Sequence, residues 1–274
     1  MGRQDNAHAS ASDLRGARDP VSEPLSAAEV RELWAFVHGD IMIVGIRQHL
    51  RRAMGLCPRH TWGYALAEIE LWVHGAGVRG GHQPFDVCVL YEDLLEHVAA
   101  ALRAHHAPWR HDLRPLITAT DSCRICDALK TTGVKSGLPG LGGLDRHSLA
   151  TEANATTWTA AWCRETQSVW RPRICPVCLV RSARVPVPTG YPSPDQPPES
   201  TEFCCRLHLA ELPLNPATGC RVGARLDEVR ARTRRLLTSM TQLGAAATPD
   251  ENASWIEALG WFAGWDVPLG LTST

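Results

Sequence analysis

Four short pairs of cysteine and histidine stand out in this sequence because each pair has two intervening residues. They are Cys57/His60, Cys123/Cys126, Cys175/Cys178 and Cys205/His208. This spacing lets one tight turn present two ligands to one tetrahedral ion, with Zn–S bonds of roughly 2.3 Å. Two pairs complete a four-ligand site, so the four pairs predict two zinc ions per chain.

The sequence leaves open which pair joins which. Joining the first pair to the second and the third to the fourth gives two sites of three cysteines and one histidine. The alternative places both CxxC pairs in one site of four thiolates. It leaves two weaker CxxH pairs, for which His147 and Cys163 are substitute ligands. The matching composition of the two mixed sites favours the first arrangement.

Four further cysteines lie outside these pairs: Cys88, Cys163, Cys204 and Cys220. Cys88 falls on the apolar face of a predicted helix, which is typical of a buried structural thiol. Cys204 is adjacent to a predicted ligand. It either packs in the core or competes for the metal, and competition would make that site sensitive to oxidation.

Composition and charge restrict the class of protein. The chain has 274 residues, 44% of them hydrophobic and 21% charged, with a formal net charge of −1. These values are typical of a globular chain, and they favour neither nucleic acid nor an anionic membrane as a partner. The sequence shows no apolar run near the ~18 residues that span a bilayer and no signal-peptide core. We expect a cytoplasmic protein, where cysteine clusters bind metal more often than they form disulfides.

The pattern of apolar residues predicts an all-α fold, an irregular helical domain in which two loop regions are pinned by zinc. Residues 1–24 are predicted to be a disordered tail, residues 25–110 a helical region with the first CxxH pair, and residues 111–274 a metal-binding region with C-terminal helices. The last two regions are expected to form one globular unit. Helices are predicted over 26–38, 41–54, 57–73, 84–106, 153–170, 205–212, 222–243 and around Trp255–Phe262, with loops at 75–81, 133–143 and 184–200.

Local signals position several of these helices. Ser26 followed by Glu29 is typical of a capping box at the start of the first helix. In the third helix, Trp62, Leu66, Ile69 and Val73 are spaced as an amphipathic stripe. The fourth helix is predicted to bury one face: Cys88, Tyr91, Leu95, Val98 and Leu102.

The CPxH and CPxC elements, with the segment Leu90–Leu95 between them, resemble a bacterial family of unknown function. Members of that family are helical and rich in cysteine, with CxxC pairs followed downstream by CxxH pairs. The resemblance covers roughly residues 45–105 and 170–265. It implies a metal-binding helical protein and supplies no reaction. This sequence differs from the pattern in that no CxxC precedes Cys57 and an additional pair stands at Cys123/Cys126.

Three functions remain compatible with these features. The first is a zinc-stabilised protein with an accessory or regulatory role, acting through a protein partner or a small molecule. The others are a metal-thiolate or iron–sulfur redox sensor, and an enzyme of specialised metabolism with structural zinc and a separate helical pocket.

No catalytic residue can be named from the sequence. Three pairs of acidic or histidine residues occur at the helical i,i+4 spacing: Glu70/His74, Glu92/Glu96 and Asp93/His97. Such pairs are more typical of a solvated face with ion pairs than of a metal site.

Overall fold

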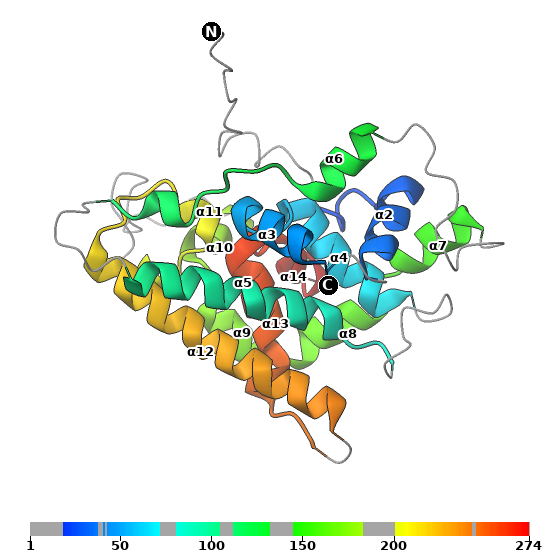
Figure 1. Cartoon of the computed structure of the whole chain (residues 1–274). Coiled ribbons are helices and arrows are strands. Elements are labelled where there is room, and N and C mark those ends of the chain that lie inside the picture. Colours follow the sequence, from blue (N-terminus) through cyan, green and yellow to red (C-terminus); the bar gives the residue numbers. More distant parts are fainter. Residues whose placement is uncertain are drawn as a thin grey trace, which may run out of the picture.

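The computed structural model describes residues 19–37, 41, 43–71, 81–104, 112–131, 145–182, 201–242 and 245–273. Every regular element in these ranges is a helix, which confirms the predicted all-α class (Figure 1). The α-helices are α2 (Ala27–Val37), α3 (Val44–Ala53), α4 (Pro58–Glu70), α5 (Phe85–Ala104), α6 (Arg124–Thr131), α7 (Arg146–Ala153), α8 (Thr157–Glu165), α9 (Gln167–Trp170), α10 (Pro176–Ser182), α11 (Arg206–Leu209), α12 (Pro216–Thr241), α13 (Pro249–Ala263) and α14 (Asp266–Leu271). Short 3-10 helices are η2 (Arg114–Leu116), η3 (Arg171–Arg173) and η4 (Thr201–Phe203).

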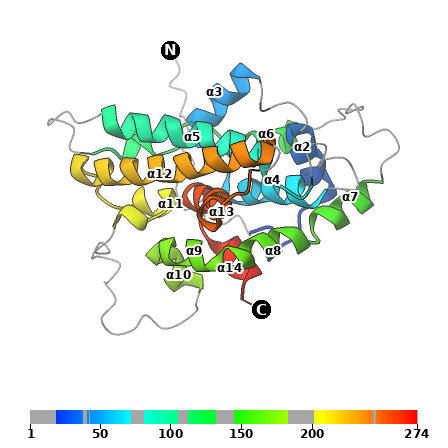
Figure 2. The ribbon, with the colours of Figure 1, turned by 90° about the horizontal axis from the view of Figure 1, so that it is seen from below.

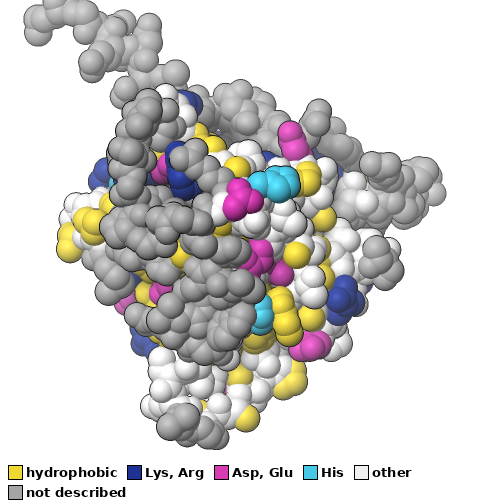
Figure 3. All heavy atoms as spheres, turned by 90° about the vertical axis from the view of Figure 1, so that its right-hand side faces the viewer, with side chains coloured by type: hydrophobic (Ala, Val, Ile, Leu, Met, Phe, Trp, Pro, Cys, Tyr) yellow, Lys and Arg dark blue, Asp and Glu magenta, His cyan; other side chains and the backbone are white. Residues whose placement is uncertain are grey.

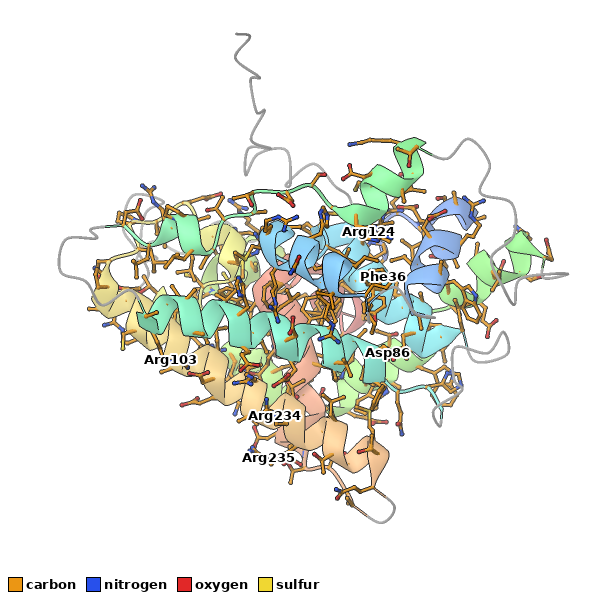
Figure 4. The ribbon with its side chains drawn as sticks, in the orientation of Figure 1. Phe36, Asp86, Arg103, Arg124, Arg234 and Arg235 are labelled. Carbon is orange, nitrogen blue, oxygen red and sulfur yellow. The ribbon has the colours of Figure 1, made fainter. Side chains whose placement is uncertain are left out.

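The two long helices α5 and α12 lie side by side along one side of the molecule (Figures 1 and 2). Ion pairs connect their outer faces. Arg230 of α12 lies 2.8 Å from Glu92 and 2.7 Å from Glu96 of α5, and Arg234 also pairs with Glu92. In the last turn of α5, Arg103 pairs with Asp227 of α12. Figure 4 labels Arg103 and Arg234. Glu92 and Glu96 therefore form ion pairs between the two helices. This agrees with the interpretation of the acidic residues as part of a solvated face with ion pairs rather than a metal site.

Helix α13 lies in the interior, and every residue from Ala253 to Ala263 is buried. It begins at a capping box, in which Thr248 and Glu251 bond each other's backbone N–H groups. Within the protein, Trp255 meets Trp62 of α4 edge-to-face, with ring centroids 6.4 Å apart. Helix α13 therefore joins α4, α5 and α12 into one core.

The apolar stripe predicted for α4 is confirmed at Trp62, Leu66 and Ile69, which are buried, but the helix has no solvent-facing side, because it is buried on every side from His60 to Glu70. Val73, the fourth residue of the stripe, lies outside the described residues. Periodicity missed this burial because two glutamates that interrupt the apolar pattern bind backbone donors inside the protein. Glu68 accepts hydrogen bonds from the first turn of α5, including Val87 N at 2.8 Å. Glu70 accepts one from Thr159 N of α8, also at 2.8 Å. Both carboxylates thus satisfy N–H groups at helix starts. The helical partner predicted for Glu70, His74, lies outside the described residues.

Other boundaries differ from the prediction for local reasons. The capping box at Ser26 is confirmed: its backbone N–H donates to Glu29 Oε2 at 2.8 Å, and its hydroxyl accepts from Glu29 N at 3.3 Å. The helix predicted over 153–170 is divided into α8 and α9, and Thr156, with φ +55°, separates α8 from α7. Helix α12 begins six residues early because the side chain of Asn215 caps it.

Of the tail predicted to be disordered over 1–24, residues 19–24 are described, and they form a turn in which Asp19 accepts from Val21 N and Glu23 N, with Val21 packed against the core. Residues 1–18 and the loops predicted at 133–143 and 184–200 lie outside the described residues. Among the described helices, none has both the length and the apolar character required to cross a bilayer.

Candidate metal centres

The eight predicted ligands come together in two groups of four. The N-terminal cluster consists of Cys57, His60, Cys123 and Cys126, and the C-terminal cluster of Cys175, Cys178, Cys205 and His208. Within each cluster, one ligand atom from every residue lies within 4.8 Å of the others. The structure therefore brings together the first pair with the second and the third with the fourth. The all-thiolate arrangement of the two CxxC pairs does not occur.

Each cluster begins with the same local construction. Cys57 and Cys205 are the N-cap residues of α4 and α11, with nearly equal backbone angles (φ −66° and −69°, ψ 163° and 161°). The extended N-cap directs the cysteine toward the first helical turn, where the histidine of each CxxH pair lies. Cys123 and Cys175 stand directly before α6 and α10 in the same way. In all four pairs, the first ligand directly precedes a helix and the second lies in the first turn of that helix.

The distances within both clusters agree with one tetrahedral ion. Nδ1 of His60 lies 3.2, 3.3 and 3.5 Å from the sulfurs of Cys57, Cys126 and Cys123. Nδ1 of His208 lies 3.2, 3.3 and 3.5 Å from those of Cys205, Cys175 and Cys178.

The sulfur–sulfur distances lead to the same conclusion. They are 3.8 Å between Cys57 and Cys126 and 3.7 Å between Cys178 and Cys205. A tetrahedral zinc with ordinary bond lengths requires about 3.8 Å between sulfurs and about 3.6 Å between sulfur and nitrogen. The residues present therefore fit such an ion.

The two clusters differ in exposure to solvent. All four residues of the C-terminal cluster are buried, whereas the three cysteines of the N-terminal cluster are half-buried around the buried His60. Helix α6, which follows Cys123, buries only Ile125. The N-terminal cluster thus holds a weakly packed helix at the surface, and the C-terminal cluster lies inside the protein.

A carboxylate lies behind the N-terminal cluster. Glu29 Oε1 is 3.2 Å from Nε2 of His60 and 2.6 Å from Nε of Arg59. Burial acts to raise the pKa of Glu29, but hydrogen bonds from His60, Arg59 and Ser26 lower it well below its usual range. An ionised Glu29 keeps the proton on Nε2, which leaves Nδ1 free to bind a metal.

A buried cation lies behind the C-terminal cluster. Arg206 is 4% exposed and bonds only backbone oxygens among the described residues, those of Phe262 and Ile117. Burial lowers the pKa of its guanidinium to about 10, and a neighbouring charged Cys205 opposes that effect. A divalent ion with three thiolates and one neutral histidine carries a net charge of −1. Arg206 has the charge that such a centre requires as a neighbour.

Hydrogen bonds among the thiols shift their pKa values in both clusters. Hydrogen bonds with Cys126 and Cys57 lower the pKa of Cys123, and hydrogen bonds with Cys123 and Cys126 raise the pKa of Cys57. In the other cluster, hydrogen bonds from Cys178, Cys204 and Cys205 lower the pKa of Cys175. One thiolate per cluster is thus stabilised by its neighbours, whereas a divalent cation would favour ionisation of all three thiols.

The remaining predicted candidates lie apart from both clusters, with one exception. Cys204 is buried and its thiol hydrogen-bonds to Cys175, so it lies directly beside the C-terminal cluster. Cys88 and Cys163 are fully buried within the core, and His147 is exposed in α7. Asp93, from the predicted Asp93/His97 pair, bonds Arg51 instead.

Comparison of the chain with known family models, curated proteins and solved structures finds no match. The chemistry of the two clusters therefore has to follow from their own geometry.

Proposed function

We propose that this chain binds two zinc ions, one in each cluster, and that both ions are structural. The observation that carries the proposal is the geometry of two groups of three sulfurs and one imidazole nitrogen at tetrahedral distances. Closed sites of four protein ligands, three cysteines and one histidine among them, are typical of structural zinc. In each cluster the thiol sulfurs are close enough to share a single ion, which favours zinc over an iron–sulfur cluster.

The architecture supports a structural role for the metal. The N-terminal cluster connects α4 to the segment before α6, 63 residues or more along the chain. The C-terminal cluster joins α10 to α11 across residues 183–200. Each ion would therefore close a long loop, and closing such a loop restricts the unfolded chain as a disulfide does.

We further propose that the protein acts in an accessory or regulatory role, by binding a partner. Four protein ligands leave no coordination position for a water molecule, so zinc would not supply a hydroxide nucleophile. Its contribution would be to fix the helices that present the binding surface. On the face seen in Figure 3, the described apolar, acidic, basic and histidine side chains are interspersed. This mixture favours a protein or small-molecule partner over nucleic acid, in agreement with the near-zero net charge. A bacterial, cytoplasmic protein remains the expectation of the sequence.

Elemental analysis of the purified protein, combined with its visible spectrum and thermal melting, tests this proposal. We expect two zinc per chain, no visible absorbance, and a melting temperature that falls when a chelator removes the metal. A coloured protein containing iron and labile sulfide would contradict the zinc assignment. Complete zinc loss with an unchanged melting curve would contradict the structural role and favour a sensor.

A further inference from the structure

The two clusters have the same ligand types and nearly the same dimensions, but they differ in access to solvent. One pair of sulfurs in the N-terminal cluster, those of Cys57 and Cys126, is 3.8 Å apart, and Cys178 and Cys205 of the C-terminal cluster are 3.7 Å apart. Every cysteine of the N-terminal cluster is half-buried, whereas the cysteines of the C-terminal cluster are between 0% and 4% exposed. Because ligands and distances match, a difference in reactivity toward a dissolved reagent should follow from access.

The half-buried thiols adjoin a helix that packs weakly. Helix α6 lies at the surface beside α2 (Figure 1), and Ile125 is the buried residue of this helix. The hydroxyl of Thr131 donates to the backbone oxygens of Asp127 and Ala128, and Asp127 accepts from the hydroxyl of Ser122. These bonds stay within the segment and do not attach it to another helix. Small movements of α6 therefore admit a solute to the sulfurs without opening the core.

Two thiolates at this distance can be oxidised to a disulfide in two steps. A bound zinc ion keeps its thiol ligands ionised, and the thiolate is the nucleophilic form of cysteine. The first thiolate attacks one oxygen of a hydroperoxide, which gives a sulfenic acid and releases hydroxide or alkoxide. The second thiolate attacks that sulfur and displaces hydroxide, which forms the disulfide. The two sulfurs together lose two electrons, and these reduce the peroxide.

We propose that the N-terminal cluster is a redox-controlled zinc site, in which a hydroperoxide joins Cys57 to Cys126 and the ion leaves. This inference rests on the proposed function, because it requires zinc in both clusters. The disulfide leaves only Cys123 and His60 of the four ligands, and a structural zinc site takes four.

The disulfide would also preserve the connection that the ion makes. Cys57 stands directly before α4, Cys126 lies in the first turn of α6, and the two are 69 positions apart. A covalent link across such a separation restricts the unfolded chain, as the ion does. Oxidation therefore removes the metal without detaching α6 from α4, and reduction restores the ligands in a folded chain.

The C-terminal cluster has more thiols nearby but should react more slowly. Cys204 adds a fourth sulfur beside Cys175, and both residues are 0% exposed. A peroxide reaches these sulfurs only when the core opens, and core opening requires far more free energy than movement of a surface helix. Burial therefore protects the second ion, and the same chain contains an internal control for the first.

The test uses the full chain with both ions bound and hydrogen peroxide as the oxidant. All samples carry Cys220→Ser, because Cys220 is exposed and would react by itself. Catalase stops the reaction at successive times, gel filtration removes released zinc, and elemental analysis measures the zinc that remains. We expect one zinc per chain to be lost at least tenfold faster than the other. Peptide mapping after alkylation of free thiols should then find Cys57 joined to Cys126, and reduction with added zinc should restore two ions.

Two variants show which ion leaves first. Cys175→Ser disrupts the C-terminal cluster, so the remaining ion should be lost at the fast rate. Cys123→Ser disrupts the N-terminal cluster, so the remaining ion should be lost at the slow rate. Thermal melting of each variant before oxidation shows whether it is folded, and the mapping of the parent chain does not depend on either variant.

The failure of this inference can be distinguished from failure of the proposed function. Fewer than two zinc ions per chain before oxidation would contradict the proposed function and the inference with it. With two ions bound, three results would overturn the inference alone: equal rates of loss for both ions, fast loss in Cys123→Ser, and a free Cys57 thiol after the first ion has left.

Discussion

The carboxylate of Glu29 hydrogen-bonds to Nε2 of His60 at 3.2 Å, on the side of the ring opposite the three thiols of the N-terminal cluster. The same glutamate stands three residues after the N-cap Ser26 and completes the capping box that starts α2. One side chain therefore connects the start of the first described helix to the N-terminal cluster. Such outer partners fix the tautomer and orientation of a ligating histidine.

Glu29→Gln should weaken zinc binding at the N-terminal cluster. Glutamine keeps the capping box, since either residue serves at that position, but it loses the charge that orients His60. We expect an affinity about 10–100-fold lower at this cluster and an unchanged affinity at the other. Competition with a chelating dye measures both.

Glu251→Gln is the control for the Glu29 substitution. Glu251 occupies the same capping-box position in α13 and contacts neither cluster. If Glu251→Gln and Glu29→Gln reduced zinc affinity equally, the effect would come from helix capping rather than from His60.

Arg206→Met should weaken the C-terminal cluster, because it removes the positive charge beside a centre of net charge −1. We expect zinc affinity at that cluster to fall at least tenfold, since outer partners have effects of that size. Arg206→Lys keeps the charge but loses part of the hydrogen bonding, so its affinity should be intermediate. Equal zinc retention by Arg206→Met and the parent would show that the buried guanidinium does not balance a metal-thiolate charge.

Cys175→Ser should lose about one zinc per chain. Bound zinc present at a thousandfold above its dissociation constant contributes about 4 kcal/mol of stability. For a chain of this size, that loss corresponds to a fall in melting temperature of roughly 8 °C or more. Cys88→Ser is the matched control: its thiol is equally buried but belongs to neither cluster, so both ions should remain.

Cys204 adds one condition to that experiment, because its thiol is a neighbour of Cys175, outside the four-residue cluster, and a movement of its side chain could replace the lost ligand. The double variant Cys175→Ser/Cys204→Ser removes this replacement. Full zinc content in the double variant would exclude Cys175 as a ligand.

The sequence predicts the eight cluster residues because their signal is local. Two residues between ligands is a property of one turn, and it persists in any fold that contains the turn. The equal composition of the two sites favours the observed pairing, but the sequence leaves the all-thiolate alternative open, because the choice depends on which distant segments the fold brings together. That these residues bind metal stays a prediction until an ion is measured.

Glu29 and Arg206 could not be assigned from sequence because their roles depend on distant neighbours. Glu29 is recognisable as a capping residue, but His60 lies 31 positions away. Arg206 stands inside a CxxH pair, and the sequence does not reveal that it is buried or that, among the described residues, it bonds only backbone oxygens. The helix periodicity of α4 likewise does not reveal that Glu68 and Glu70 are buried, because their backbone partners belong to α5 and α8.

Gly260→Ala should destabilise the core around α13. A Cβ at this position would lie 2.5–2.7 Å from ring atoms of Trp265, which stacks on Trp170 and has little room to move. We expect a loss of about 1–3 kcal/mol from overpacking, measured by denaturant unfolding. Gly45→Ala in α3 is the control, because nothing lies within 4 Å of its added methyl group. It should be neutral or slightly stabilising, and a similar loss in both variants would contradict the packing argument.

The two clusters should release zinc to a chelator at different rates. The three cysteines of the N-terminal cluster are half-buried and lie beside the weakly packed α6, whereas all four residues of the C-terminal cluster are buried. A chelator reaches the first ion by a small local opening, but the second requires opening of the core. We expect biphasic release, with one ion per phase and rates that differ at least tenfold. Cys123→Ser should abolish the fast phase and Cys175→Ser the slow phase. A single phase containing both ions, or loss of the slow phase in Cys123→Ser, would show that burial does not control release.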